Sequence, residues 1–163
     1  MDFYHIKDEY IDFLRQYDHI VPDNKHESRP YLGIIIQIDD IKYYAPFTSP
    51  KPKHLRMKNG KDFRKIHGGE YGAINLNNMI PVPDVALVPF VINEEPDRQY
   101  RELLQRQYFA VSQDFVNIIN VATKLRELIF TDDKNLSKHD LEIKKRCCNL
   151  PLLESVYMEY KSE

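Results

Sequence analysis

Residues 29–51 read R-P-Y-L-G-I-I-I-Q-I-D-D-I-K-Y-Y-A-P-F-T-S-P-K, and the rest of the chain is organised around this stretch. Its two apolar runs, Tyr31 to Ile38 and Ile41 to Phe47, are rich in β-branched and aromatic residues and are separated only by Asp39-Asp40. Such residues favour strands, and a pair of polar residues between two strands favours a tight turn. The stretch therefore predicts a β-hairpin.

The hairpin ends in a short polar corner, Thr48-Ser49-Pro50-Lys51. Pro50 has no backbone N–H to donate and holds Ser49 extended, so we expect the second strand to stop here. Two hydroxyls and an ammonium group would then lie beside exposed backbone N–H groups, a combination that suits a bound phosphate. The alternative is structural, because Thr48 and Ser49 can also cap a turn through side chain to backbone bonds.

Basic residues follow the corner directly. Residues 51–65 hold seven of them against Asp62 alone, a net charge of +6, whereas residues 1–28 have a net charge of −4 and the whole chain has −2. The seven are Lys51, Lys53, Arg56, Lys58, Lys61, Arg64 and Lys65. Charge runs usually form solvated faces, which is the interpretation we prefer for a second cluster, Lys144-Lys145-Arg146. Because residues 51–65 continue the corner, we predict that this basic loop binds an anionic partner such as nucleic acid.

Short strands and several helices are expected around the hairpin. Periodicity and turn residues predict strands at 2–6, 63–66 and 71–76, and an edge or irregular strand at 85–92, where Pro89 interrupts the apolar run. Helical spacing predicts helices at 7–17, 96–108 with Asp97 as a possible N-cap, 115–130, 137–146 and 152–160. The predicted fold class is α+β, with a twisted antiparallel sheet.

Length and composition fit one domain over residues 1–163. No run approaches the roughly 18 apolar residues of a membrane span, and the acidic, polar N-terminus is unlike a secretory signal, so a cytoplasmic protein with no membrane partner is expected. The two cysteines are adjacent, and the six histidines show no H-x-H or H-E-x-x-H spacing. We therefore expect no metal site and no cofactor.

Five motifs, in this order, resemble the ToxN/AbiQ toxins of type III toxin–antitoxin systems. They are F-Y-x-I near the N-terminus, a helix bearing Tyr10, R-P-Y-L-G-I, Y-x-A-P-F-T-S-P-K with a following His54, and I-N-L-N-N-M-I-P-V-P. The resemblance implies a metal-independent endoribonuclease that acts on cellular or phage messenger RNA. It also implies inhibition by a small structured RNA antitoxin in a protein–RNA hetero-oligomer. The implied fold is like that of the MazF and Kid toxins, a twisted antiparallel sheet closed into a small barrel and flanked by helices.

The corner offers candidates for RNA cleavage without a metal. Lys51 and Arg29 are expected to hold phosphate oxygens through charge-assisted hydrogen bonds, and Ser49 and Thr48 to donate to the same oxygens. The general base stays open, because an ordinary lysine side chain has a pKa of about 10.4 and would need a strong downward shift. A histidine titrates near pH 6.5, so His54 serves either in proton transfer or as a contact to phosphate or base.

The predicted site also includes two tyrosines, each of which has a purely structural alternative. Tyr10 lies at helical spacing with Leu14, a pattern more typical of a core residue than of a catalytic one. Only the resemblance places it among the predicted catalytic residues. Tyr31 is expected either to stack on a base or to be simply a strand residue. The predicted catalytic residues are Lys51, Ser49, Thr48, Arg29, Tyr10 and His54. The predicted RNA-binding residues are Tyr31, Lys53, Arg56, Lys58, Lys61, Arg64 and Lys65.

Two other classes of function use the same basic loop. One is a non-catalytic RNA-binding regulator, and the other is a protein-interaction module whose basic face meets an acidic partner. The combination of Thr48 and Ser49 with Lys51 and Arg29 favours the nuclease, because a simple binder would not need these residues as a set.

Overall fold

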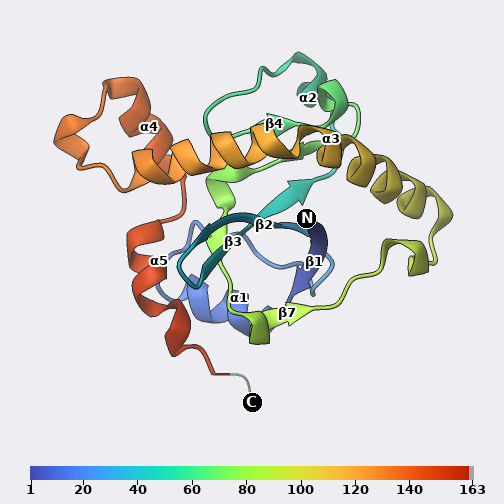
Figure 1. The fold of residues 1–163 in the computed structure, drawn as a ribbon, viewed down its shortest axis with the longest axis horizontal. Helices are drawn as coiled ribbons and strands as arrows, with labels where there is room; N and C mark the ends of the chain where they lie inside the picture. Colours follow the sequence, from blue (N-terminus) through green and yellow to red (C-terminus); the bar gives the residue numbers. More distant parts are fainter. Residues whose placement is uncertain (162–163) are drawn as a thin grey trace.

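An antiparallel sheet lies at the centre of the fold, and helices surround it (Figure 1). The computed structural model describes residues 1–161. The strands in this range are β1 (Asp2–Ile6), β2 (Tyr31–Ile38), β3 (Ile41–Thr48), β4 (Arg64–Lys65), β5 (Ala73–Ile74), β6 (Ile80–Pro81) and β7 (Leu87–Val88). The α-helices are α1 (Asp8–Arg15), α2 (Pro52–Arg56), α3 (Arg98–Ile129), α4 (Lys138–Arg146) and α5 (Leu150–Val156). The predicted α+β class with an antiparallel sheet is confirmed.

The predicted hairpin is confirmed and is the longest strand pairing of the sheet. Ile38 lies opposite Ile41, which leaves Asp39 and Asp40 as the turn. The strands follow the order β4-β5-β3-β2-β1-β7, with β6 also paired to β3. Among residues 1–161 no pairing joins β4 to β7, so the sheet has two open ends. Most hairpin side chains are buried, because other strands and helices cover both faces.

The predicted short strands are present but brief. Strands β4 and β5 lie within the predicted strands 63–66 and 71–76. They flank the turn that contains Gly68, Gly69 and Gly72, and they pair with each other. In the predicted strand at 85–92, only Leu87–Val88 pairs, with Ile6 and His5 of β1. Proline at position 89 cannot donate to a ladder, which accounts for the early end of this strand.

One prediction about the helices is wrong. The two helices expected at 96–108 and 115–130 are a single helix of 32 residues, α3. The intervening segment, Phe109 to Asp114, contains neither glycine nor proline, and buried residues keep helical spacing through it, with Leu104, Val111 and Ile118 on one face. Asp97 is the N-cap as predicted, since its carboxylate accepts a hydrogen bond from the backbone N–H of Tyr100 at 3.0 Å.

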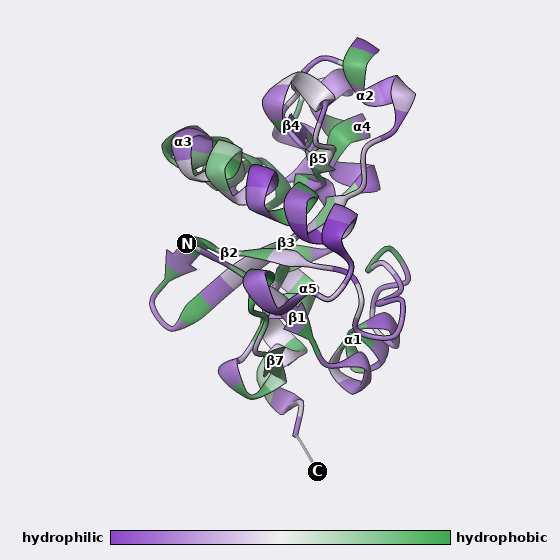
Figure 2. Ribbon diagram, turned by 90° about the vertical axis from the view of Figure 1, so that its right-hand side faces the viewer, coloured by the Kyte–Doolittle hydropathy of each residue, from purple (hydrophilic) through white to green (hydrophobic). Residues whose placement is uncertain are grey.

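Helix α3 crosses the whole molecule. Figures 1 and 2 show it between the hairpin on one side and the segment containing α2, β4 and β5 on the other. It carries hydrophobic and hydrophilic residues side by side (Figure 2). In residues 1–161 no helix is both long and apolar enough to cross a membrane. The position of α3 matters for the site because the basic loop lies directly beside it.

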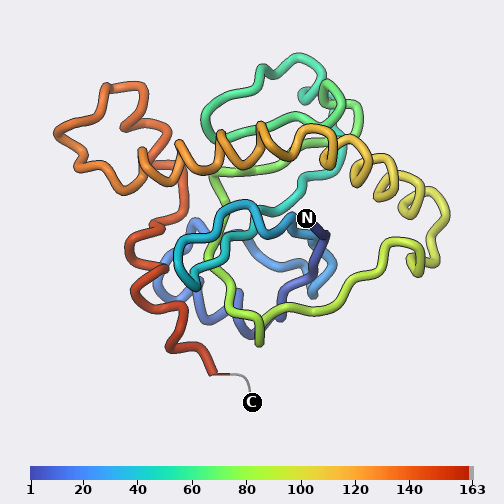
Figure 3. The backbone as a smooth tube through the Cα atoms, in the orientation of Figure 1, coloured from blue at the N-terminus to red at the C-terminus, as the bar shows by residue number. Residues whose placement is uncertain are grey.

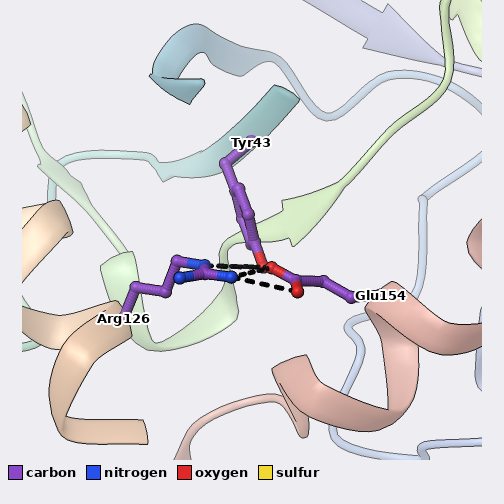
Figure 4. Close-up of polar contacts among 3 residues, drawn as sticks. All are labelled: Tyr43, Arg126 and Glu154. Carbon is purple, nitrogen blue, oxygen red and sulfur yellow. Dashed lines mark hydrogen bonds and ion pairs between the residues drawn. The ribbon is translucent and has the colours of Figure 1, made fainter. Parts of the chain in front are cut away.

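A polar contact ties α3 and α5 to the hairpin (Figure 4). The Arg126 guanidinium donates to both carboxylate oxygens of Glu154, at 2.7 and 3.0 Å from Nη2, and the Tyr43 hydroxyl donates to the same carboxylate. The Arg126 side chain is 18% exposed and that of Glu154 is 13% exposed. Arg126 also lies over the Phe130 ring, 4.0 Å from its centroid. Charged groups this deep need such partners.

Candidate active site and basic loop

The candidate active site is the corner at the end of β3. Thr48 is the last paired residue of the strand, opposite Ala73 of β5. Ser49, Pro50 and Lys51 then leave the sheet and are exposed, with Lys51 in an extended conformation. Pro50 and Pro52 flank Lys51, and since neither can donate a backbone bond, the sheet cannot continue past Thr48. The hydroxyl residues Thr48 and Ser49 and the Lys51 ammonium group thus lie within four residues at the end of the strand, with Ser49 and Lys51 exposed and Thr48 partly exposed.

His54 fixes the backbone of Lys51. The backbone N–H of Lys51 donates to Nδ1 of His54 at 3.2 Å, and the backbone N–H of His54 donates to the Lys51 carbonyl at 2.9 Å. The imidazole is only 1% exposed and lies beside the Phe63 ring. Burial lowers the pKa of His54, and the nearby cations of Lys51 and Lys53 lower it further. The neutral ring with Nδ1 as acceptor is therefore the favoured form.

Arg29 reaches the corner from the neighbouring strand. Tyr31 lies opposite Pro46, and the backbone N–H of Phe47 donates to the Pro30 carbonyl at 3.0 Å. Continuing this register by one residue places Arg29 across from Thr48. Its guanidinium donates to the Asp23 carbonyl at 3.3 Å and is partly exposed. The backbone of Arg29 thus lies beside the segment that holds Thr48, Ser49, Lys51 and His54, which are close together in the sequence.

Two glycines that the sequence reasoning did not assign to the site support the corner from behind. Gly72 has φ +92°, and a Cβ there would lie 2.2 Å from the Thr48 carbonyl oxygen. Gly69 has φ +95°, and a Cβ there would lie 2.4 Å from the His54 carbonyl oxygen. Both positions need glycine for conformation and for space. The signal in the sequence is the spacing G-G-x-x-G over residues 68–72.

The basic loop leaves the end of β3 and returns to the sheet at β4, as the trace in Figure 3 shows. It is more structured than predicted, since it contains α2 and β4. Four of its cations are exposed and have no carboxylate partner within residues 1–161: Lys51, Lys53, Arg56 and Lys58.

Two other cations of the basic loop are already paired. Arg64 makes a bidentate ion pair with Asp114 of α3, both distances being 2.7 Å, and Lys61 lies 2.6 Å from Asp140 of α4. Burial opposes ionisation of Asp114, but hydrogen bonds from Arg64 and Asn117 hold its pKa below the ordinary value. These two side chains therefore join the loop to helices in the free protein, a role that the sequence did not indicate. Lys65 is partly exposed and has no carboxylate partner in the described chain.

The C-terminal basic cluster also has structural contacts. Lys144 donates to the Thr131 carbonyl and lies 2.7 Å from Asp133, and Arg146 binds Asp62 through two bonds of 2.6 and 2.9 Å. Only Lys145 lacks a carboxylate partner among the residues described. Asp62, the one acidic residue of the basic loop, is thus neutralised by a residue from outside it.

Two of the predicted site residues, Tyr10 and Tyr31, lie in the core. Tyr10 is fully buried, and its hydroxyl donates to the Pro81 carbonyl at 2.5 Å. Tyr31 is fully buried as well, in the middle of the β1–β2–β3 pairing. Burial raises the pKa of both phenols. Both rings thus occupy the core positions that their structural alternatives describe, because these strands and α1 turn them inward.

The arrangement suits binding and polarisation of a phosphodiester. Thr48, Ser49 and Lys51 are consecutive on the chain apart from Pro50, and Arg29 lies across from Thr48 in the strand register, so these residue types could donate to the non-bridging oxygens of a phosphodiester bound at the corner. No group of three or more His, Cys, Asp or Glu side chains that could hold a metal lies within residues 1–161.

Comparisons with known proteins point to one family. Residues 2–158 match the family model of the toxin ToxN of type III toxin–antitoxin systems. The chain is 33% identical over 163 residues to the endoribonuclease ToxN of Bacillus thuringiensis subsp. kurstaki, covering 98% of this chain and 84% of that protein. It is 25% identical over 166 residues to the endoribonuclease AbiQ of Lactococcus lactis subsp. lactis, covering 94% and 85%.

A solved structure shares the whole fold. That structure describes selective toxin inhibition by a non-coding RNA pseudoknot in bacterial type III toxin–antitoxin systems. The two structures superpose with a TM-score of 0.84 at 30% sequence identity, covering 99% of this chain and 98% of that one.

Proposed function

The chain belongs to the ToxN toxin family of type III toxin–antitoxin systems, and from this membership we propose that it is an endoribonuclease that cuts single-stranded RNA at the corner after β3. The reaction is attack of a ribose 2′-hydroxyl on the adjacent phosphorus. The observation that carries the proposal is the set of donors at the end of β3, the partly exposed Thr48 and the exposed Ser49 and Lys51, whose backbone is held by His54 and Gly72. A phosphodiester bound at the corner would lie beside these groups. A turn that Thr48 and Ser49 merely cap would not require them as a set.

In this scheme each corner residue has a role in charge stabilisation. The 2′-hydroxyl loses its proton, its oxygen forms a bond to phosphorus, and the bond to the 5′-oxygen breaks as that oxygen takes up a proton. Negative charge grows on the non-bridging oxygens, where Lys51, Arg29 and the two hydroxyls donate hydrogen bonds. The products carry a 2′,3′-cyclic phosphate and a 5′-hydroxyl. Lys51 and His54 are the candidates for the proton transfers, and variants of His54 discussed below separate them.

The RNA partners follow from the same surface. We propose that a small structured RNA antitoxin binds the basic loop and covers the corner, in a protein–RNA hetero-oligomer, and that cellular or phage messenger RNA is the substrate. The exposed cations Lys53, Arg56 and Lys58 continue from the corner, so one anionic ligand on them excludes another. Inhibition is then occlusion of the corner.

The proposal is tested with purified protein freed of RNA, a labelled single-stranded RNA and excess chelator. Cleavage should persist and give the cyclic phosphate and 5′-hydroxyl ends. Ser49→Ala and Lys51→Ala should each lower the cleavage rate by about a hundredfold or more, the usual cost of one lost transition-state donor. Lys138→Ala, which removes an exposed cation of α4 outside the basic loop, is the control and should stay near the wild-type rate. Loss of activity in chelator with recovery on adding a divalent ion would overturn the metal-free mechanism. RNA binding without any cleavage would favour the non-catalytic regulator.

A further inference from the structure

A groove runs along α3 beside the turn that supports the corner. One part is a cavity of about 360 Å³ whose lining includes Asn59, Arg64, Lys65 and Asp114. The next part is a cavity of about 520 Å³ whose lining includes Tyr71, Gln105, Arg106 and Phe109. Both are lined by His67, Ala110 and Gln113, so the two cavities adjoin. The groove therefore has a polar half and an aromatic half.

The aromatic half presents flat rings to solvent. The rings of His67 and Tyr71 stack on each other with centroids 4.7 Å apart and an interplanar angle of 12°. Phe109, from α3, lines the same cavity and is 65% exposed. An exposed phenylalanine contributes little to the core, whereas aromatic faces beside a nucleic-acid site are where unstacked bases bind. The exposed Arg106 offers a guanidinium plane and a cation at the same place.

The charges in the groove are largely balanced. Arg64 is paired with Asp114, His67 lies 3.2 Å from Glu70, and Glu102 pairs with Arg98. Lys65 and Arg106 are the lining cations without a carboxylate partner in the described part of the chain. The groove thus differs from the corner, where uncompensated cations predominate. A flat, neutral ring with a phosphate at its edge fits this distribution better than a row of phosphates does.

The groove also adjoins the corner through the backbone. Gly69 contacts His54 and Gly72 contacts Thr48, and both glycines lie in the turn that carries His67 and Tyr71. A strand of RNA that leaves the corner toward this turn would pass next to these rings.

We propose that this groove is a nucleobase subsite: an unstacked base of the bound single-stranded RNA lies against Phe109 and the His67–Tyr71 pair, with its backbone near Lys65 and Arg106. The subsite rests on the function proposed above. It contributes affinity through stacking, and it selects RNA whose flanking nucleotide is unpaired.

The test compares two oligomers with the wild-type chain and with Phe109→Leu, which keeps an apolar side chain but removes the ring. One is a twelve-residue 2′-O-methyl oligoadenylate, which cannot be cut because its attacking hydroxyl is blocked. The other has the same number of phosphates and no bases. Phe109→Leu should weaken oligoadenylate binding about tenfold and leave the abasic oligomer unchanged, because base stacking is removed while the phosphates still meet the same cations. Phe109→Trp should restore the wild-type affinity.

Val116→Leu is the matched control, since Val116 is also an exposed apolar residue of α3, 72% exposed, and lines neither cavity. Equal loss on both oligomers, or no loss on either, overturns the subsite. A change in self-association with unchanged RNA affinity, seen by sedimentation, overturns it as well and makes Phe109 a protein contact. Failure of the proposed function is distinct, because it is seen in the wild-type chain, which would then not cut RNA, whatever Phe109→Leu does to oligomer binding.

Discussion

At the residue scale, two hydrogen bonds join His54 and Lys51 into one unit. The imidazole accepts the Lys51 backbone N–H, and the Lys51 carbonyl accepts the His54 N–H. His54 is buried while Lys51 is exposed. This division indicates that His54 positions the backbone from which the Lys51 ammonium group projects. A displacement of about 1 Å in such a group can cost about a hundredfold in rate.

Substitutions of His54 separate positioning from proton transfer. His54→Asn places an amide oxygen near the position of Nδ1 and should keep cleavage within about tenfold of wild type, whereas His54→Leu should lose about a hundredfold. The measurement is the single-turnover cleavage rate. If both variants are equally inactive, His54 takes part in proton transfer.

The pH profile gives a second readout of the same residue. Because the pKa of His54 is lowered, its neutral form is favoured in the folded protein, and its contribution to stability is present above the ordinary pKa of about 6.5. That contribution is lost as the pH falls through the lowered pKa, where protonation of Nδ1 breaks the bond from Lys51. Cleavage by the wild-type chain should fall in this acid range, and His54→Asn should lack that part of the decline.

At the scale of elements, the turn between β4 and β5 acts as a support for the end of β3. Its glycines approach the backbone of Thr48 and His54 more closely than any residue with a Cβ could. The exposed corner is thereby held by a structured turn rather than by its own side chains. A rigid support lowers the cost of ordering the corner when RNA binds.

Gly72→Ala is expected to disturb this support. The positive φ of +92° and the approach of 2.2 Å to the Thr48 oxygen should destabilise the fold by about 1–3 kcal/mol and displace the corner. Cleavage per folded molecule should fall at least tenfold. Gly68→Ala is the control, since Gly68 also has a positive φ, +65°, but has no atom within 4 Å of its would-be Cβ. Urea unfolding and single-turnover rates are measured for both, and equal rates for the two variants would show that the corner does not depend on the turn.

At the scale of the whole molecule, charges fall into two groups. Many basic side chains that connect elements are paired with carboxylates, whereas those that follow the corner remain free. The network of Arg126, Glu154 and Tyr43 belongs to the first group and joins α3, α5 and β3 (Figure 4). The free cations Lys53, Arg56 and Lys58 belong to the second and form the surface for RNA.

The network of Arg126, Glu154 and Tyr43 should contribute to the stability of the fold and not to the rate of RNA cleavage. Glu154→Leu leaves the partly buried Arg126 without its carboxylate and should lower the free energy of unfolding by about 3 kcal/mol. Combining Arg126→Met with Glu154→Leu should recover part of that loss, since no charge is left unpaired. Urea denaturation of the single and double variants measures the coupling, and strictly additive losses would contradict it. Cleavage per folded molecule should stay unchanged in both.

The free cations should control the salt dependence of RNA binding. Changing Lys53, Arg56 and Lys58 together to alanine should make the plot of log affinity against log salt shallower by about 0.7–0.9 for each phosphate that these side chains no longer neutralise. Replacing Lys124, Lys134 and Lys138 by alanine removes the same charge from other exposed positions and should leave the slope unchanged. An equal slope in wild type and the loop variant would place the RNA on another face.

Much of this protein was determined by its local sequence. The hairpin follows from β-branched runs and two aspartates, the corner from Pro50, the N-cap of α3 from Asp97, and the free cations from the run after Lys51. The same local information did not predict the length of α3. Two helices were predicted at 96–108 and 115–130, although the residues between them include no glycine or proline. Propensity, proline and charge act over a few residues, so they can be predicted without knowing what lies opposite.

Other features were decided only by the tertiary structure. The burial of Tyr10 and Tyr31 depends on which elements cover them, and the pairing of Arg64 with Asp114 joins residues 50 positions apart. The burial of His54 was decided in the same way, since its ring lies beside Phe63 and its backbone packs against Gly69. The burial of a side chain and the identity of its ion-pair partner depend on contacts between distant segments. The free energies of these contacts come from desolvation and packing when the chain folds. The sequence therefore determined which residues could do the chemistry, and the fold decided which of them reach the solvent.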